Sequence, residues 1–508
     1  MNWNSKLKEQ MTVTNYEGVK AYAMTPELEL YTAVVTASLS DLFYEKQDER
    51  VNRIAALVGK VSPEFVARLA VYARTQMHLR SIPLLLLVEL AKVHNGDDLV
   101  ARAVEKTVLR ADEIMELLMC YQWRNPSTDP RKKLGKLSRQ IQNGLQRAFN
   151  RFDEYQFAKY DRDNLEVKLR DALFLVHPKA KDEQQQVLFD KIVNRQLEIP
   201  YTWETELSAL GQQQFASDEE KTAAFRQKWE ELVRSGKLGY MALMRNLRNM
   251  LQVDISFDDL QVVCDRLSDA AQVAKSKQLP FRYLSAYREV EKVNGTGTSM
   301  LMSALETAVK HSATNIESID EHTRVLLASD VSGSMLWSNV SAKSTVRLFD
   351  IGLLLSMLLK SRCQQVIAGI FGSTWRVVNM PSDNILMATR QLERLEGTVG
   401  YSTNGFKVID WLIEQNQVMD KVMMFTDMQM WDSTGRDSTL EKSWRRYKQL
   451  APQAKLYLFD LGGYGQSPLR LVEPDVYLIA GWSDRVFDVL SAIDSGADAL
   501  SVINKIEV

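Results

Sequence analysis

Apolar residues recur at helical spacing through most of the first half of the chain. Ser62 and Pro63 are residue types that open a helix. An apolar stripe follows at spacings of three and four residues, formed by Val66, Leu69, Ala70, Ala73 and Met77. The same pattern predicts further helices from Pro83 and over residues 98–109, 111–119, 134–149 and 184–195. Successive helix pairs between about residues 28 and 278 predict an all-α solenoid of the HEAT type, although no clean repeat period is visible.

The second half alternates between short apolar runs and longer amphipathic segments. Strands are expected over residues 324–329, 365–371, 375–380, 421–426, 455–461 and 476–480, and helices over residues 344–360, 404–414, 439–450 and 483–493. The two strands within 365–380 are short enough and close enough to form a hairpin. This alternation predicts a doubly wound α/β sheet. We therefore expect a multidomain protein with a helical domain over residues 1–318 and an α/β domain over residues 319–508.

Polar side chains stand where two of the predicted strands end. Asp330, Ser332 and Ser334 follow the run 324–329, and Asp427 follows the run 421–426. Ligands of open α/β sheets gather at the carboxyl ends of the strands. Hard cations prefer oxygen ligands, so this placement predicts a site for Mg²⁺, with Mn²⁺ as the alternative. An isolated Asp or Ser at this position more often caps the next helix, but the full D-x-S-x-S string and the second Asp favour a metal site.

Composition and charge limit the classes of protein to consider. The chain has 508 residues, 45% of them hydrophobic, and a net charge of -2. Residues 319–508 hold 19 basic and 22 acidic residues, a charge of -3, which leaves 44 basic and 43 acidic residues, +1, in residues 1–318. Neither part is a polycation, so contact with nucleic acid must come from local clusters.

The compartment is also predicted from composition. The beginning of the sequence lacks the pattern of a secretory signal, and the longest apolar run, Ile82 to Val88, is too short to cross a bilayer. Cys120, Cys264 and Cys363 are far apart and odd in number, which favours neither a disulfide framework nor a zinc site. We therefore expect a cytoplasmic protein without contact to a membrane.

One local cluster of positive charge lies in residues 131–151, which carry seven Lys and Arg side chains and no acidic residue. In a helix, Lys132, Lys136 and Arg139 would share one face. The opposite face would be apolar and would contain Leu134, Leu137, Ile141 and Leu145. Such a basic face can follow the phosphates of a nucleic acid, but it can equally be a solvated face that pairs with acids elsewhere.

The α/β half resembles the von Willebrand factor A domain with its metal-ion-dependent adhesion site. That family takes an Asp and two Ser from one loop, a Thr from a second loop and an Asp from a third. Asp330, Ser332, Ser334, Thr403 and Asp427 match these positions. Asn404 stands where the family often has Asp. The resemblance implies a metal site that binds an oxygen from a partner and does not catalyse hydrolysis.

The first half resembles the TROVE module of the Ro autoantigen family. The resemblance rests on the sequence at residues 78–81, 151–160, 239–248 and 279–284. In that family a ring of HEAT-like helices precedes a von Willebrand A domain, which is the order expected here. The resemblance implies a monomeric ring of the bacterial Ro type that is not an enzyme.

The resemblance also implies RNA partners and RNA-binding residues. The expected ligands are a Y-type small non-coding RNA and misfolded or maturing RNAs with single-stranded ends, handled in RNA quality control by a separate exoribonuclease tethered through RNA. Lys159 and His177 match family positions that contact Y RNA, and Arg162 lies beside a third such position. Together with Lys132, Lys136 and Arg139, these are the predicted RNA contacts.

Two other functions stay open from the residues themselves. Asp330 and Asp427 would also suit a Mg²⁺-dependent hydrolase, but the five histidines are scattered, and the sequence has neither a phosphate-binding P-loop nor a G-x-S-x-G string. The other is a protein-only adhesion scaffold, in which the metal binds an acidic partner without RNA. The basic stretch argues for RNA, because an adhesion scaffold needs no such patch.

Overall fold

The computed structural model describes residues 11–37, 42, 44–126, 136–313, 320–341, 344–379, 381, 383–435, 439–471, 475–496 and 500–508. The chain divides into two compact units. One contains residues 1–52 and 239–502, and the other contains residues 53–238 and 503–508. Over the described residues, no helix combines the length and the apolar composition that crossing a membrane requires.

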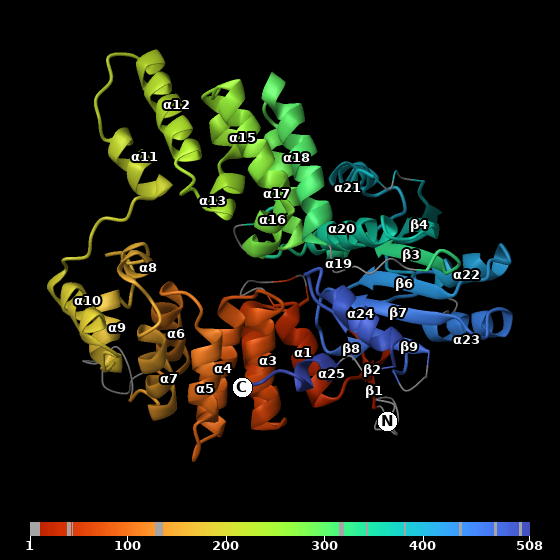
Figure 1. Ribbon diagram of the computed structural model, residues 1–508. Coiled ribbons are helices and arrows are strands. Elements are labelled where there is room, and N and C mark those ends of the chain that lie inside the picture. The colour runs from red at the N-terminus through yellow and green to blue at the C-terminus, as the bar shows by residue number, and fades with distance from the viewer. Residues whose placement is uncertain are drawn as a thin grey trace. The chain divides into compact units, whose positions relative to one another are not determined.

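The unit formed mainly by residues 53–238 is helical (Figure 1). Its helices are α3 (Pro63–Thr75), α4 (Ser81–Val93), α5 (Leu99–Thr107), α6 (Asp112–Arg124), α7 (Arg139–Phe149), α8 (Glu154–Ala158), α9 (Leu169–Val176), α10 (Glu183–Asn194), α11 (Trp203–Gly211) and α12 (Asp218–Arg234). Helix α3 packs on α5 and α5 on α7, while α4 packs on α6 and α6 on α9. Stacking of alternate helices in two layers is the arrangement of a HEAT-type solenoid, as the sequence predicts.

Local sequence explains where these helices begin. The Ser62 side chain accepts a hydrogen bond of 3.2 Å from Phe65 N, and Pro63 occupies the first turn of α3. Helix α7 begins at Arg139, after Ser138, and not near residue 134 as expected. Lys136 therefore precedes the helix and shares no helical face with Arg139, and Lys132 lies outside the described residues.

The other unit contains a six-stranded sheet within the described residues, in the order β5-β4-β3-β6-β7-β9. The strands are β3 (Arg324–Asp330), β4 (Gln365–Phe371), β5 (Trp375–Val377), β6 (Lys421–Thr426), β7 (Lys455–Asp460) and β9 (Val476–Ala480). All neighbours are parallel except β4 and β5, which form the predicted hairpin. From the central strand β3 the chain first adds β4 and β5 on one side of the sheet. It then crosses to the other side of β3 and adds β6, β7 and β9. The carboxyl ends of β3 and β6 therefore form the topological switch point, where ligands of such sheets bind.

Helices connect and cover these strands. They are α19 (Gly333–Leu336), α20 (Leu348–Lys360), α21 (Ile385–Glu393), α22 (Phe406–Glu414), α23 (Leu440–Leu450) and α24 (Val486–Asp494), and the short α25 (Ser501–Asn504) follows where the boundary between the two units falls. The crossover through α20 runs in the direction opposite to those through α22 and α23. Because such crossovers are right-handed, α20 lies on one face of the sheet and α22 and α23 on the other. This is the doubly wound fold that the sequence predicts.

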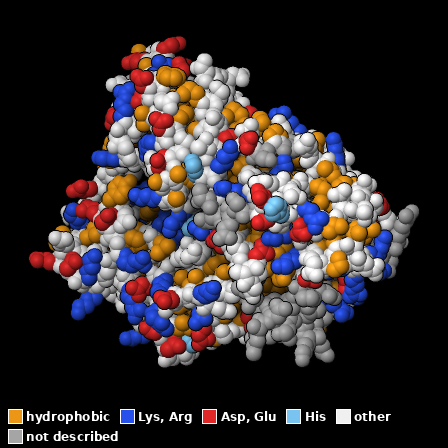
Figure 2. Space-filling model, turned by 45° about the vertical axis from the view of Figure 1, so that its right-hand side comes forward, with side chains coloured by type: hydrophobic (Ala, Val, Ile, Leu, Met, Phe, Trp, Pro, Cys, Tyr) orange, Lys and Arg blue, Asp and Glu red, His pale blue; other side chains and the backbone are white. Residues whose placement is uncertain are grey.

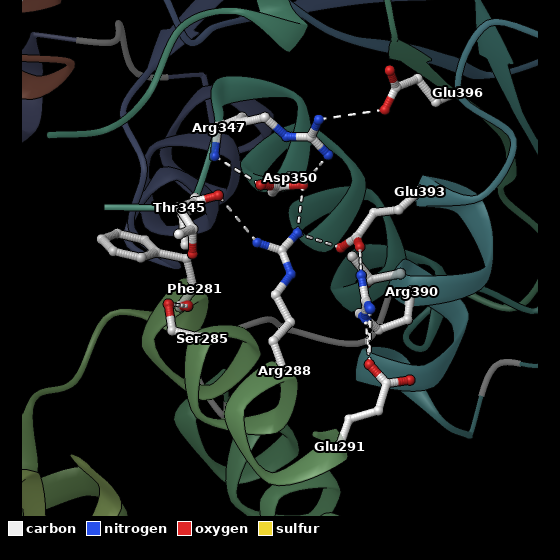
Figure 3. Close-up of polar contacts among 12 residues, drawn as sticks. Phe281, Ser285, Arg288, Glu291, Thr345, Arg347, Asp350, Arg390, Glu393 and Glu396 are labelled. Atoms are coloured by element: carbon white, nitrogen blue, oxygen red, sulfur yellow. Dashed lines mark hydrogen bonds and ion pairs between the residues drawn. The ribbon is translucent and has the colours of Figure 1, made fainter. Parts of the chain in front are cut away.

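Six further helices belong to the same unit as the sheet. They are α13 (Tyr240–Arg245), α14 (Leu247–Gln252), α15 (Phe257–Ser268), α16 (Ala270–Ser276), α17 (Pro280–Glu291) and α18 (Thr296–Ser312). Arg288 of α17 reaches both α20 and α21, with 2.6 Å to Asp350 and 2.6 Å to Glu393, and Arg390 of α21 lies 2.8 Å from Glu291 (Figure 3). Asp350 has no solvent exposure, so the two ion pairs of Arg288 are buried and depend on one another, whereas Arg390 and Glu291 are partly exposed.

The boundaries of the compact units therefore differ from the change in secondary structure. Helices give way to the sheet between Ser312 and Arg324, around the residue 318 expected from sequence. The helices α13–α18 nevertheless pack with the sheet, because the ion pairs of Arg288 and Arg390 join them.

The N-terminal segment also packs with the sheet. It contains β1 (Thr12–Thr14), β2 (Lys20–Ala23), α1 (Pro26–Val35) and the start of α2 (Gln47–Val58). Strand β2 pairs with β8 (Gln466–Ser467), forming a small sheet in the order β1-β2-β8. Neither β1 nor β2 was expected, because each is too short to show a period of two.

A substitution at Gly144 of α7 tests how closely α7 packs against α5. A Cβ atom at this position of α7 would lie 2.5 Å from Val104 Cβ and 2.7 Å from Ala101 O of α5. We predict that Gly144→Ala destabilises the protein by about 1–3 kcal/mol, because overpacking outweighs the gain of about 1 kcal/mol in helix propensity. Thermal unfolding monitored by circular dichroism measures the change.

Gly211→Ala at the end of α11 is the matched control. Its Cβ would have Phe225 at 4.0 Å as its nearest neighbour, so we expect no loss of stability. Equal unfolding midpoints for Gly144→Ala and the unchanged protein would contradict the close approach of α5 and α7.

Candidate functional site

The turn after β3 brings together the first three predicted metal ligands. Ser332 N donates 2.9 Å to Asp330 Oδ1, and the two hydroxyl oxygens of Ser332 and Ser334 are 3.5 Å apart. Thr426, the last residue of β6, donates 2.6 Å to Asp330 Oδ2. The carboxylate of Asp330 is thereby fixed at the switch point between the two strands.

Asp427 begins the loop after β6 and lies beside the same turn. The nearby Ser334 side chain lowers the pKa of its carboxyl group, and Gln429 N donates 3.1 Å to Asp427 Oδ1. Met428 has φ 67°, a left-handed backbone conformation that residues other than glycine rarely adopt. Such strain concentrates at functional sites. Asp427 Oδ2 is buried and has no hydrogen-bond partner among the described residues.

The loop that carries Thr403 joins the two others through its backbone. Gly333 N donates 2.9 Å to Tyr401 O, and Trp431 N donates 3.0 Å to Thr403 O. Asn404 is fully buried, where its side chain donates 3.0 Å to Ser373 O and accepts 2.9 Å from Ser433 N. An amide both donates and accepts, which a carboxylate cannot do, so Asn suits this position of the loop.

The electrostatics of this site fit a divalent cation. Asp330 and Asp427 have no solvent exposure, and Ser332, Ser334 and Thr403 are also buried. Burial raises the pKa of Asp330 and of Asp427, and their mutual repulsion raises the pKa of Asp330 further. All available donors are oxygens, the unpartnered Asp427 Oδ2 among them, which suits Mg²⁺ or Mn²⁺.

Carboxylates alone do not build this site. Within the described parts of the chain, no three His, Cys, Asp or Glu side chains are grouped to hold a metal. The candidate site therefore depends on the hydroxyl groups of its serines as well as on Asp330 and Asp427.

Sequence reasoning missed four residues near this site. Asp460 ends β7, is fully buried, and has its pKa raised to about 7 by burial. Its position at a strand end was a usable signal, but it lacks neighbouring hydroxyls. We call the loops that carry Asp330, Thr403 and Asp427 the metal loops. Gln429 belongs to the loop of Asp427, and Glu17 and Tyr44 of the N-terminal segment approach the metal loops. No local signal marks Glu17 or Tyr44, because the contacts of the N-terminal segment span more than 400 residues of sequence.

Lys159 and Arg162, two of the predicted RNA contacts, line one cavity of about 390 Å³ in the helical unit. The cavity lies between residues 158–162, after α8, and residues 197–205. The Lys159 ammonium group is 5.9 Å from the centre of the Tyr155 ring and 5.7 Å from that of Tyr160. Acidic residues line the cavity too, namely Asp161, Glu198 and Glu204. The cavity thus offers cations and aromatic rings together with competing negative charge.

His177 and Arg139 form a second group beside α7 and α9. His177 is exposed and ends α9 in a left-handed conformation, with φ 49°. Gln146 of α7 donates 3.1 Å to His177 O, and Gln142 donates 3.1 Å to Val176 O. Arg139 lies one turn before Gln142, so it shares the face of α7 that meets the end of α9.

The remainder of the basic stretch is partly neutralised. Arg147 lies 3.3 Å from Glu105, and Arg151 donates to the backbone oxygen of Glu105. On the face drawn in Figure 2, Lys and Arg side chains alternate with Asp and Glu side chains. For Arg147, the interpretation as a face paired with acids elsewhere is therefore confirmed, and Arg139 and Lys136 stay predicted contacts.

Comparisons with known proteins give the family. The TROVE domain family matches residues 3–196 and 194–327. Telomerase protein component 1 of Rattus norvegicus is 22% identical over 320 residues, which covers 48% of this chain and 12% of that protein. The Mus musculus protein of the same name is 23% identical over 317 residues, covering 47% and 12%. This chain thus spans only about an eighth of the length of these relatives.

The fold is also similar to a solved structure. The crystal structure of the Deinococcus radiodurans Ro (RSR) protein superposes with a TM-score of 0.58 at 19% identity, covering 93% of this chain and 100% of that one. The fold class expected from sequence, HEAT-like helices followed by a von Willebrand A domain, is confirmed.

The buried carboxylates predict how pH changes stability. Asp330, Asp427 and Asp460 have raised pKa values, so the metal-free folded protein holds protons that the unfolded chain releases above pH of about 4. Stability without metal should therefore fall as the pH rises from about 5 to about 7. Urea unfolding in a chelator at several pH values measures this slope, and added Mg²⁺ should restore stability at the high end.

The variant Asp460→Asn isolates the contribution of one carboxyl group to the pH dependence of stability. A difference of one pKa unit corresponds to about 1.4 kcal/mol, so the variant should lose less stability than the unchanged protein over this range. Identical slopes for the two proteins would show that the Asp460 carboxyl does not titrate between pH 5 and 7.

Proposed function

This chain belongs to the TROVE domain family, and from that membership we propose that it is an RNA-binding scaffold of the bacterial Ro type. The family match over residues 3–196 and 194–327 is the observation that carries the proposal. The fold supports it, because stacked helices precede an α/β domain in the order of the Ro protein of similar structure. The resemblance of the sequence to Ro proteins is confirmed at the level of family and fold.

The proposed ligands are structured small RNAs of the Y type and misfolded or maturing RNAs with single-stranded ends. The scaffold holds them in the cytoplasm for a separate exoribonuclease, which is tethered through RNA. The net charge of the chain is only -2, so recognition rests on local groups. Lys159 and Arg162 supply phosphate contacts at their cavity, and Tyr155, whose ring is 46% exposed, offers a surface for stacking a base.

Arg139 and His177 supply a second contact region in this proposal. They lie on exposed surface where α7 meets the end of α9, in the same helical unit as the cavity. Lys136, just before α7, is exposed and extends this region. A structured RNA contacts such separated points through its shape, whereas a short single strand engages fewer of them.

The A domain in this proposal binds one Mg²⁺ or Mn²⁺. Asp330, Ser332, Ser334, Thr403 and Asp427 are the residues that would hold it. The bound cation neutralises two carboxylates that are otherwise buried together, and it supplies a position for a further oxygen ligand. Such a site binds and does not cleave, so the chain is proposed not to be an enzyme.

One observation favours docking of a protein partner as a second function of the A domain. Trp337 and Tyr401 stack with their ring centres 6.0 Å apart and are 60% and 48% exposed. Both belong to the loops that carry the metal ligands. Exposed aromatic residues beside a metal are suited to an interface, because they anchor partners with little loss of side-chain entropy.

The first prediction for this function concerns the cavity. We expect Lys159→Ala/Arg162→Ala to flatten the slope of log affinity against log salt by roughly 0.7 to 0.9 for each lost phosphate contact. A structured small RNA should lose more affinity than a random single strand of equal length. Fluorescence anisotropy at several salt concentrations measures both.

The control removes the same charge elsewhere in the helical unit. Lys221→Ala/Arg234→Ala replaces two exposed cations of α12 and should leave the slope unchanged. Equal losses of RNA affinity in the two double variants would show that only net charge matters. Unchanged affinity in Lys159→Ala/Arg162→Ala would place the RNA site away from the cavity.

A further prediction is that the purified protein leaves labelled RNA intact with Mg²⁺ present. The reason is that the candidate metal site found among the described residues is buried and of the adhesion type, with no histidine base among its proposed ligands. Gel electrophoresis after prolonged incubation provides the measurement. Cleavage that copurifies with the protein and disappears in Asp427→Ala would contradict the scaffold role.

A further inference from the structure

The turn between β1 and β2 lies on the loop that begins with Asp427. The Asn15 side chain donates 2.8 Å to Met430 O, and Tyr16 N donates 2.9 Å to Gln429 Oε1. Asn15 also orders the turn itself, because its side-chain oxygen accepts 3.1 Å from Glu17 N and 2.9 Å from Val19 N. Gly18 has φ 78°, the conformation that this tight turn requires. Glu17 is therefore held at a fixed place beside the metal loops.

The side chain of Glu17 is connected to the proposed ligands through Tyr44. The Tyr44 hydroxyl donates to Glu17 Oε1, and the nearby Ser334 side chain lowers the pKa of this hydroxyl. The Glu17 carboxylate is therefore held by Tyr44 beside the turn of Ser334, and its negative charge repels that of Asp427.

Aromatic rings and one arginine fix this arrangement. Tyr44 stacks on Tyr16 at 5.2 Å between ring centres, and its edge meets Tyr464 at 5.6 Å. Arg50, which is 3% exposed, donates 2.6 Å to Gly462 O, in the loop next to Asp427. A second bond of 2.6 Å joins Arg50 to Glu45, the residue after Tyr44. The N-terminal segment is therefore anchored on both sides of the metal loops.

From these contacts we propose that Glu17 is an intramolecular ligand of the A-domain cation. The bound metal then holds the N-terminal segment against the sheet. The inference rests on the metal site of the proposed function. It adds that this chain supplies its own acidic group at the side of the site where a partner's oxygen would bind.

The chemical reason is charge and coordination number. A hard cation takes about six oxygens, whereas the D-x-S-x-S turn, Thr403 and Asp427 supply five if each side chain binds through one oxygen. A carboxylate brought in by residues 11–52 completes the set and neutralises the dication. Without metal, the negative charges of Glu17 and Asp427 repel each other, so docking of the N-terminal segment and metal binding should strengthen each other.

The test measures Mn²⁺ binding by electron paramagnetic resonance in the full chain and in three variants. Glu17→Gln keeps the size of the side chain and removes its charge, and should weaken Mn²⁺ binding by about 10-fold to 100-fold, the range for groups that support a metal site. Glu27→Gln makes the same change at the start of α1 and should bind as the unchanged protein does. Asp330→Ala should not bind.

Hydrogen exchange supplies a second readout that does not depend on affinity. The amides of Tyr16 to Val19 are hydrogen-bonded in the docked turn. Saturating Mg²⁺ should slow their exchange in the unchanged protein and in Glu27→Gln, but not in Glu17→Gln. This comparison also shows that Glu17→Gln is folded, because exchange in the sheet should be the same.

The outcomes separate the two levels of the hypothesis. If the unchanged protein and Asp330→Ala bind Mn²⁺ alike, the metal site itself is wrong. Suppose that Asp330→Ala loses Mn²⁺ binding, while Glu17→Gln binds Mn²⁺ with unchanged or higher affinity and its exchange is still slowed by Mg²⁺. The metal site then stands, and Glu17 is not its ligand.

Discussion

Asp330 and Asp427 are held together without exposure to solvent at the ends of two adjacent parallel strands. Two such charges repel each other and have lost their hydration, so the folded chain must either protonate them or supply a cation. Much of the surrounding structure meets this requirement. Thr426 and Ser332 donate hydrogen bonds to the Asp330 carboxylate, and the loops of Thr403 and Asp427 are tied together through their backbones.

The N-terminal segment packs beside the same buried carboxylates. Residues 1–52 belong to the compact unit of the sheet, although more than 180 residues of helical solenoid separate them from it in sequence. Asn15, Tyr44 and Arg50 all reach the loops around Asp427. Helices α13–α18 join the same unit through Arg288 and Arg390. The A domain thus organises segments from both ends of the helical region, while residues 53–238 carry the proposed RNA contacts.

Local patterns predicted the features whose causes are local. The stripe after Ser62, the strand ends at Asp330 and Asp427 and the hairpin at β4 and β5 all rest on neighbours within a few residues. The start of α7 was misplaced, because the apolar spacing includes Leu137 although residues 136–138 are not helical. Glu17 and Tyr44 had no signal in the sequence, since their significance comes from chain segments packed across more than 400 residues. Asp460 lacked the hydroxyl groups that marked the other strand ends.

A direct test is the anomalous diffraction of crystals grown with Mn²⁺. The account predicts one strong peak between Asp330, Ser332 and Ser334, with a Glu17 carboxylate oxygen within about 2.5 Å of the ion. Such a map would establish the cation, its ligands and the position of the N-terminal turn in one measurement. A map without a peak at the ends of β3 and β6, or with a peak whose remaining ligands are all solvent while Glu17 points away, would contradict it.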